Sequence, residues 1–263
     1  MRIRFAAAAL LALTSGSAAL ADNDDAPAQA ARWHEVSTAI FGDHAIEDGS
    51  AVLKLTVPVR TMDAALVPVL VELTGARHVA TLSVVVDNNP APLVGTLHFG
   101  PAFAQQGVKL RVRVNNFTLV HAIAETDDGK LYAVARYVKA AGGCSSPSTG
   151  ESAETLARIG KMQLRRTRLA ESTDVPAQLL ISHPNYNGMQ RDPGTGGYTP
   201  PRYLKSVSVS VGGAKAFDFD SGISLSEDPS ISFTYVPQGD GVVDVVARDS
   251  SSAVFSQHFD AMP

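Results

Sequence analysis

Apolar and polar residues alternate in short segments along most of this 263-residue chain, and turn residues end many of these segments. Residues 108–114 alternate valine and leucine with lysine and arginine, and residues 206–211 alternate serine with valine. A period of two is that of a strand with one buried face and one exposed face. Short strands at this spacing, with no long helices between them, predict an all-β chain of immunoglobulin-like β-sandwiches.

The predicted strands fall into two groups, which indicates two β-sandwich domains at residues 33–141 and 161–263. A short helix over 33–41 opens the first domain, and residues 151–159 suit one or two helical turns. Residues 142–160 between the domains form a flexible arm and linker, with a run of serine, proline, threonine and glycine. The other expected strands are residues 52–59, 67–73, 80–86, 119–125, 131–138, 161–165, 179–182, 231–235, 242–247 and 254–259.

Cys144 is the only cysteine of the chain, and it lies between the two predicted domains. Gly142 and Gly143 precede it and Ser145 follows, so its neighbours provide no apolar pattern that would bury it. A lone cysteine is either a small buried hydrophobe or a free thiol, and this composition favours a thiol on a flexible arm. We therefore expect Cys144 to be exposed and to react with thiol reagents at nearly the unfolded rate. The nearest cation in sequence is Lys139 and no histidine is adjacent, so a partner would have to activate the thiol.

The N-terminus has the order of a secretory signal peptide over residues 1–21. Arg2 and Arg4 precede an apolar run, and small residues end at Ala21. The apolar run is shorter than the roughly 20 residues that a membrane span needs, so we expect cleavage and no membrane insertion. Cleavage would change the formal net charge from −4 to −6. Residues 22–32 are acidic and alanine-rich and are predicted to be disordered, and the mature protein is predicted to be periplasmic.

Other chemistry has little support in the sequence. The charge is acidic and forms no basic stripe, which argues against a nucleic-acid partner. The chain contains neither a His-Glu-x-x-His nor a Gly-x-Ser-x-Gly pattern, and the glycine-rich residues 194–197 lack the lysine of a phosphate-binding loop. We therefore predict no enzyme activity, no metal and no cofactor. The seven histidines are scattered at positions 34, 44, 78, 98, 121, 183 and 258.

Two β-sandwiches with Gly-Gly-Cys at the end of the first resemble the two subunits of the SoxYZ sulfur carrier fused in one chain. The first domain is similar to SoxY, whose C-terminal arm carries the cysteine that binds sulfur intermediates. The second is similar to SoxZ, with the best match at His183-Pro184, Gly188-Met189, Arg191 and residues 201–205. The arrangement looks most like the fused SoxYZ-like carriers associated with quinoprotein (PQQ-dependent) dehydrogenases. Unlike the SoxY arm, this one continues into Ser145 and is anchored at both ends.

The resemblance implies a periplasmic carrier that holds a sulfur-containing or other small intermediate on Cys144. Its partners would be periplasmic redox enzymes, either those of thiosulfate oxidation or a PQQ-dependent dehydrogenase with a c-type cytochrome. The alternative is a non-covalent accessory subunit of such a dehydrogenase, in which Cys144 is incidental. An autonomous sulfur-transfer enzyme lacks an activating base near the thiol. We also expect the two sandwiches to pack on each other and to unfold together.

Overall fold

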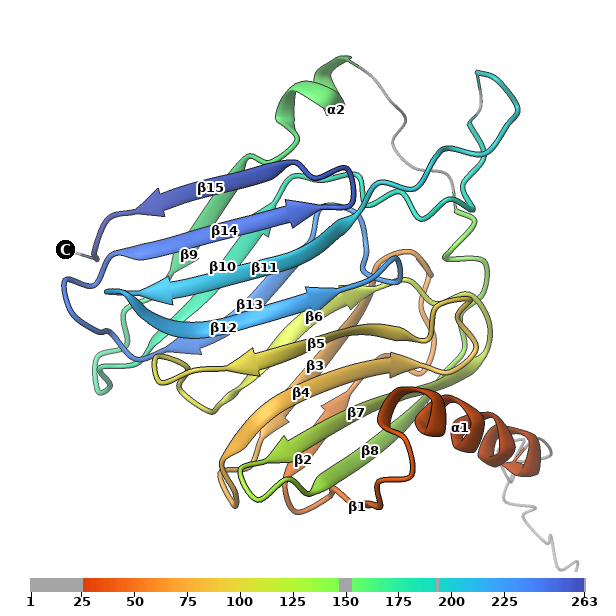
Figure 1. Ribbon diagram of the computed structural model, residues 1–263, viewed down its shortest axis with the longest axis horizontal. Helices are drawn as coiled ribbons and strands as arrows, with labels where there is room; N and C mark the ends of the chain where they lie inside the picture. The colour runs from red at the N-terminus through yellow and green to blue at the C-terminus, as the bar shows by residue number, and fades with distance from the viewer. Residues whose placement is uncertain (1–25, 147–152, 193, 263) are drawn as a thin grey trace, which may run out of the picture.

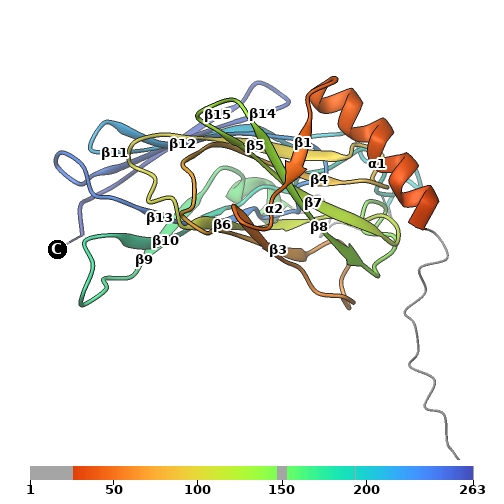
Figure 2. The same ribbon diagram turned by 90° about the horizontal axis from the view of Figure 1, so that it is seen from below.

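The computed structural model describes residues 26–146, 153–192 and 194–262, which form two facing β-sheets (Figures 1 and 2). One sheet has nine strands and the other has six. The nine-stranded sheet has the order β1 (Ile46–Asp48), β8 (Leu131–Val138), β7 (Thr118–Thr126), β4 (Val79–Val86), β5 (Leu93–Phe99), β12 (Ala214–Ser221), β11 (Leu204–Val211), β14 (Val243–Asp249) and β15 (Val254–Phe259). The six-stranded sheet has the order β2 (Leu53–Thr56), β3 (Val67–Leu73), β6 (Gly107–Val112), β13 (Ser230–Tyr235), β10 (Val175–Ile181) and β9 (Met162–Arg166).

Both sheets run across the boundary between the two halves of the chain. In the larger sheet β5 pairs antiparallel with β12 over five residues, and in the smaller sheet β6 pairs with β13. The all-β, two-domain immunoglobulin-like class predicted from the alternation is therefore confirmed. The two sandwiches lie edge to edge and share their sheets, and Figure 1 shows the N-terminal half continuing into the C-terminal half strand by strand.

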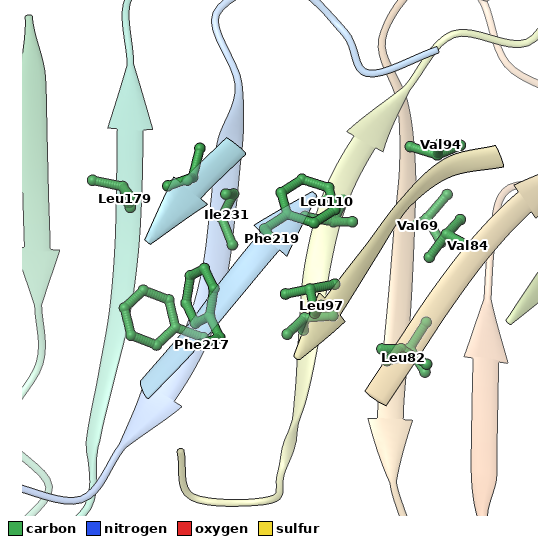
Figure 3. Packing of buried hydrophobic residues seen from close by; sticks show 14 of the residues in the cluster. Val69, Leu82, Val84, Val94, Leu97, Leu110, Leu179, Phe217, Phe219 and Ile231 are labelled. Carbon is green, nitrogen blue, oxygen red and sulfur yellow. The ribbon is translucent and has the colours of Figure 1, made fainter. Parts of the chain in front are cut away.

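The space between the sheets holds one hydrophobic cluster that extends through both halves. Leu97 and Leu110 of the N-terminal half lie beside Phe219 of the C-terminal half in Figure 3. All three side chains are at most 1% exposed. Full burial of such a side chain contributes about 1.5–3 kcal/mol. A continuous core of this kind predicts that neither half unfolds without exposing the other.

Gly95 explains why one strand at the junction was not predicted. This glycine lies in the middle of β5, and glycine in a strand interior weakens the strand pattern of the sequence. A Cβ at Gly95 would lie 2.3 Å from the Asp220 carbonyl oxygen and 2.6 Å from the Phe219 ring. The glycine therefore permits the close approach of β12 that joins the two halves. β1 and β12 are also absent from the prediction; β1 is only three residues long, and β12 alternates apolar and polar residues over Ala214–Ser221.

The helix α1 spans Ala26–Phe41, so it begins well before the helix predicted over 33–41. The expected disorder of residues 22–32 is wrong for 26–32, because alanines with high helix propensity extend the helix backwards. Pro27 is tolerated since it lies in the first turn. Trp33 stacks on His121 of β7 with ring centroids 3.7 Å apart. Residues 22–25 and the predicted signal peptide lie outside the described residues, and no helix within the described part is long and apolar enough to cross a membrane.

The second helix, α2 (Ala153–Arg158), lies within the segment predicted to form one or two helical turns. Asp-Gly and Gly-Gly pairs, which favour tight hairpin turns, form two of the turns between neighbouring strands. Gly129 adopts a φ of 74° between β7 and β8, and Gly212 and Gly213 have positive φ between β11 and β12. These turns are local features, which is why the sequence predicts them.

Candidate functional site

Cys144 lies in the segment that follows β8, between the N-terminal and the C-terminal half of the chain. Its exposed fraction is 1%. The predicted exposure of this thiol is therefore wrong. Its sequence neighbours do not bury Cys144, which agrees with the absence of apolar residues beside it. Segments that are distant in sequence cover it instead.

The main chain of the arm is hydrogen-bonded to the strand end after β6. The Gly143 N–H donates to the Val114 carbonyl oxygen at 3.0 Å, and the Gly142 N–H donates to the Asn115 carbonyl oxygen at 2.9 Å. A Cβ on Gly143 would lie 2.0 Å from the Ala64 carbonyl oxygen, so only glycine fits there. The flexible arm that the sequence predicts for Gly142 and Gly143 is therefore wrong, because Gly143 packs closely against main-chain atoms and Gly142 adopts a φ of 77° in a turn.

The residue after the thiol belongs to a tight turn. The Ser145 N–H and hydroxyl both contact the Gly142 carbonyl oxygen at 3.2 Å, and the Ser146 hydroxyl donates to the same oxygen at 2.9 Å. Ser145 itself is exposed. Residues 142–146 thus form a compact turn, with the cysteine on its inner side and Ser145 on its outer side.

The C-terminal half contacts the arm through the loop that joins β10 to β11. The Asn187 side chain in this loop donates from Nδ2 to the Cys144 carbonyl oxygen at 2.7 Å. Asn187 is 5% exposed. This bond joins the residue that bears the thiol to a segment of the other sandwich.

Arg113 provides a buried cation next to the arm. Its guanidinium donates from Nη1 to the Gly143 carbonyl oxygen at 3.3 Å and from Nη2 to the Asn185 carbonyl oxygen at 3.5 Å. Arg113 is 1% exposed, and among the described residues no acceptor lies within hydrogen-bond distance of its Nε. Burial lowers the pKa of this arginine, while the charges of Glu227 and Cys144 oppose that change.

The surroundings of Cys144 make the thiol a poor nucleophile. Burial raises the pKa of Cys144 from 9.0 to about 11, and Arg113 offsets only part of this rise. The thiolate is the reactive form of cysteine, and it is nearly absent at neutral pH when the pKa is 11. In this conformation the thiol is both shielded from solvent and unreactive as a nucleophile. We call residues 64, 113–115 and 187, which contact the arm, together with residue 185, which binds Arg113, the arm seat.

Two residues of the arm seat were not predicted as functional from the sequence. Arg113 follows the alternation of Lys109 and Arg111, which predicts an exposed position, and the C-terminal half covers it instead. Asn187 lies in the polar run after His183, where the sequence has no pattern that indicates a functional residue. That run does provide structure: the buried His183 Nδ1 lies 2.8 Å from Asn185 Oδ1, and burial lowers the pKa of His183.

The other predicted candidates do not gather at the thiol. No group of three or more histidine, cysteine or acidic side chains is arranged to hold a metal ion within the described residues. His121 is buried against Asp87, 2.9 Å away, beneath α1. The glycine-rich residues 194–197 belong to the exposed part of the β10–β11 loop.

The fold and site define a class of protein: two merged β-sandwiches that enclose between them one cysteine preceded by two glycines. Two family models match the chain. The model described as "Sulfur oxidation protein SoxY" matches residues 37–144, and the model described as "Sulphur oxidation protein SoxZ" matches residues 164–260. The chain therefore belongs to the SoxY family over its N-terminal half and to the SoxZ family over its C-terminal half, as a fused SoxYZ. SoxY and SoxZ are carrier and accessory proteins and not enzymes.

Solved structures and curated proteins were compared as well. The chain is similar to the sulfur carrier protein SoxY from Chlorobium limicola f thiosulfatophilum, at 24% identity and a TM-score of 0.38, over 44% of this chain and 98% of that one. It is also similar to a superoxide reductase (neelaredoxin) from Ignicoccus hospitalis, at 14% identity and a TM-score of 0.31, over 40% of this chain and 86% of that one. A search of curated proteins gives no match.

Proposed function

We propose that this protein is a covalent sulfur carrier and that Cys144 is the attachment residue. The observation that carries the proposal is the position of Cys144. It is the last residue matched by the SoxY model, and its carbonyl oxygen is bound by Asn187 of the SoxZ half. Both halves therefore meet at the one thiol of the chain. The family assignment supports a sulfur carrier role, and the thiol is the one group in the sequence that forms a stable bond to sulfur.

A buried thiol requires that the arm leave its seat before it reacts. Cys144 is too enclosed for a partner to reach, and its raised pKa keeps it protonated. The contacts that hold the arm are hydrogen bonds to main-chain atoms, each with a net contribution of about 0.5–1.5 kcal/mol. A partner can offset that cost through contacts of its own. Once out of the seat, the arm would present a thiol with its ordinary pKa to the partner's active site.

Loading the carrier also requires an electron acceptor. When a sulfhydryl compound joins Cys144, an S–S bond forms, both S–H bonds break, and two protons and two electrons are released. A periplasmic redox enzyme or a pair of one-electron cytochromes of the c type would accept the electrons. We propose Sox-type enzymes of thiosulfate oxidation as these partners, with export to the periplasm through residues 1–21.

The burial of Cys144 also favours a second candidate function. A thiol with a pKa of about 11 is what a structural cysteine has, and a non-covalent accessory subunit would need no more. In that case the protein docks on a periplasmic PQQ-dependent dehydrogenase or its cytochrome, and Cys144 only fills the arm seat.

Replacement of Cys144 by serine separates the two functions. Cys144→Ser keeps the shape of the site and should lower stability by only about 1–2 kcal/mol, because a hydroxyl replaces a buried thiol. A carrier loses its attachment atom and all biological activity, while an accessory subunit retains activity. Ser145→Ala, on the exposed side of the same turn, is the matched control and should behave as wild type.

Two measurements decide the outcome. Growth or dehydrogenase-coupled activity is compared in strains that carry only the variant, with melting temperature as the control for folding. Intact mass of protein taken from its own cells should show an adduct on wild type that is absent from Cys144→Ser. Normal growth of a folded Cys144→Ser strain, with no adduct on wild type, would replace the carrier by the accessory subunit.

A further inference from the structure

Asn187 is held in a fixed orientation within the β10–β11 loop. Its main-chain N–H donates to Gln190 Oε1 at 3.1 Å, and its side-chain Oδ1 accepts the Met189 N–H at 2.9 Å. Gln190 is fully buried. The remaining polar group of the side chain, Nδ2, points to the Cys144 carbonyl oxygen. The amide is thus oriented for the arm before the arm binds.

Arg113 strengthens the same connection from the other side. It contacts the carbonyl oxygen of Gly143 on the arm and that of Asn185 in the β10–β11 loop. Its main chain is fixed as well, because the Arg113 N–H donates to the Ser224 carbonyl oxygen at 2.8 Å and Asn89 Nδ2 donates to the Arg113 carbonyl oxygen at 2.7 Å. A buried guanidinium on a fixed main chain therefore contacts both the arm and the SoxZ half.

We propose that Asn187 and Arg113 are positioning residues that hold the Cys144 arm closed, and that they set how often the thiol is available to a partner. The proposal rests on the carrier function and adds a role for the SoxZ half, which would control access to a cysteine that the SoxY half carries. Both side chains bind carbonyl oxygens of the arm, so they act on its position whatever the sulfur carries. Removal of either donor should open the arm without any change in the cysteine itself.

Asn187→Asp is the sharpest variant because it keeps the size of the side chain and the oxygen that accepts the Met189 N–H. It removes the Nδ2 donor and places a carboxylate oxygen against the Cys144 carbonyl oxygen. We expect alkylation of Cys144 by iodoacetamide in the folded full-length protein to become about tenfold faster. This factor corresponds to the stabilisation of the seated arm that is lost with one hydrogen bond and with the added repulsion. Asn88→Asp is the matched control. Asn88 Nδ2 donates to the Phe117 carbonyl oxygen at 2.9 Å, which lies outside the arm, so its alkylation rate should equal that of wild type.

Amide hydrogen exchange distinguishes positioning from general destabilisation. In Asn187→Asp the Gly142 and Gly143 amides, which donate to the strand end after β6, should exchange faster, while the β7–β8 amides keep their wild-type rates. Equal alkylation of both variants and wild type would overturn the proposal. Faster exchange throughout the chain would overturn it too, because Asn187 would then be structural.

The outcome is independent of the carrier function, since iodoacetamide needs no cargo and no partner. Failure of Asn187→Asp to open the arm leaves an adduct on Cys144 possible. Absence of any adduct in cells leaves the alkylation result intact. The two proposals are therefore refuted by different observations.

Discussion

Gly143→Ala should displace the arm from the arm seat and expose Cys144. The new methyl carbon would lie 2.0 Å from the Ala64 carbonyl oxygen and 2.6 Å from that of Val114, both of them main-chain atoms next to strands. Either these strand ends move or the arm leaves. The arm is held mainly by four hydrogen bonds, to Val114, Asn115, Arg113 and Asn187. Together they contribute about 2–6 kcal/mol, less than disruption of the shared core would cost, so the arm leaves.

The magnitude follows from the pKa of the thiol. The pKa of Cys144 is about 11 in the seat and would return to 9.0 outside it. Well below both values, the thiolate fraction scales inversely with the acid constant, so at pH 8 it should rise about 100-fold. The alkylation rate of the folded protein, measured by mass spectrometry with iodoacetamide, should rise by at least this factor, because the seated thiol is also shielded from the reagent.

The control for this experiment is Gly129→Ala. Gly129 has a φ of 74° and no heavy atom within 4 Å of its Cβ position, so alanine there costs about 1–2 kcal/mol of backbone strain without touching the arm. Gly129→Ala should lower the melting temperature and leave the alkylation rate unchanged. If Gly143→Ala is alkylated as slowly as wild type at an unchanged melting temperature, the arm seat does not protect the thiol and the reasoning is refuted.

Two further predictions concern pH and the junction between the halves. Because the seated thiol has a raised pKa, the stabilisation of the seated arm is greatest below pH 9 and is lost between pH 9 and about 11. The wild-type alkylation rate should therefore keep rising over this range. A plateau at pH 9 would show an unprotected thiol. Cleavage at a protease site engineered within 147–152 should leave the halves associated on gel filtration, since the β5–β12 and β6–β13 pairs and the core join them; separation at micromolar concentration would contradict a shared fold.

The fold class could be predicted because strand patterns are local. The alternation in residues 108–112 and 206–211 depends only on which face of each strand is buried, and β6 and β11 lie where it predicts. β5 was not predicted because Gly95 weakens its strand pattern. The glycine is needed there for a close contact with β12, more than 100 residues away in sequence. The seven residues of β5 alone do not show that Gly95 permits the contact between the two sandwiches.

The candidate site was predicted in part. The single cysteine and its two glycines are visible in the sequence, and they do mark the point where the halves meet. The part that failed was exposure, because Gly142, Gly143 and Ser145 have no apolar neighbours to suggest a buried thiol. Arg113 was not predicted for a different reason, since the alternation places it on an exposed face that the C-terminal half in fact covers.

The sequence by itself determined most of the strands, the tight turns and the position of the one thiol, since each depends on residues a few positions apart. The tertiary structure decided that the two sandwiches share their sheets and that Cys144 is seated, protonated and bound by Asn187. Strand pairing, burial and the pKa of a thiol depend on which distant segments come within a few ångströms of one another. Those contacts form only when the β10–β11 loop and the strand end after β6 close on the arm from opposite halves of the chain.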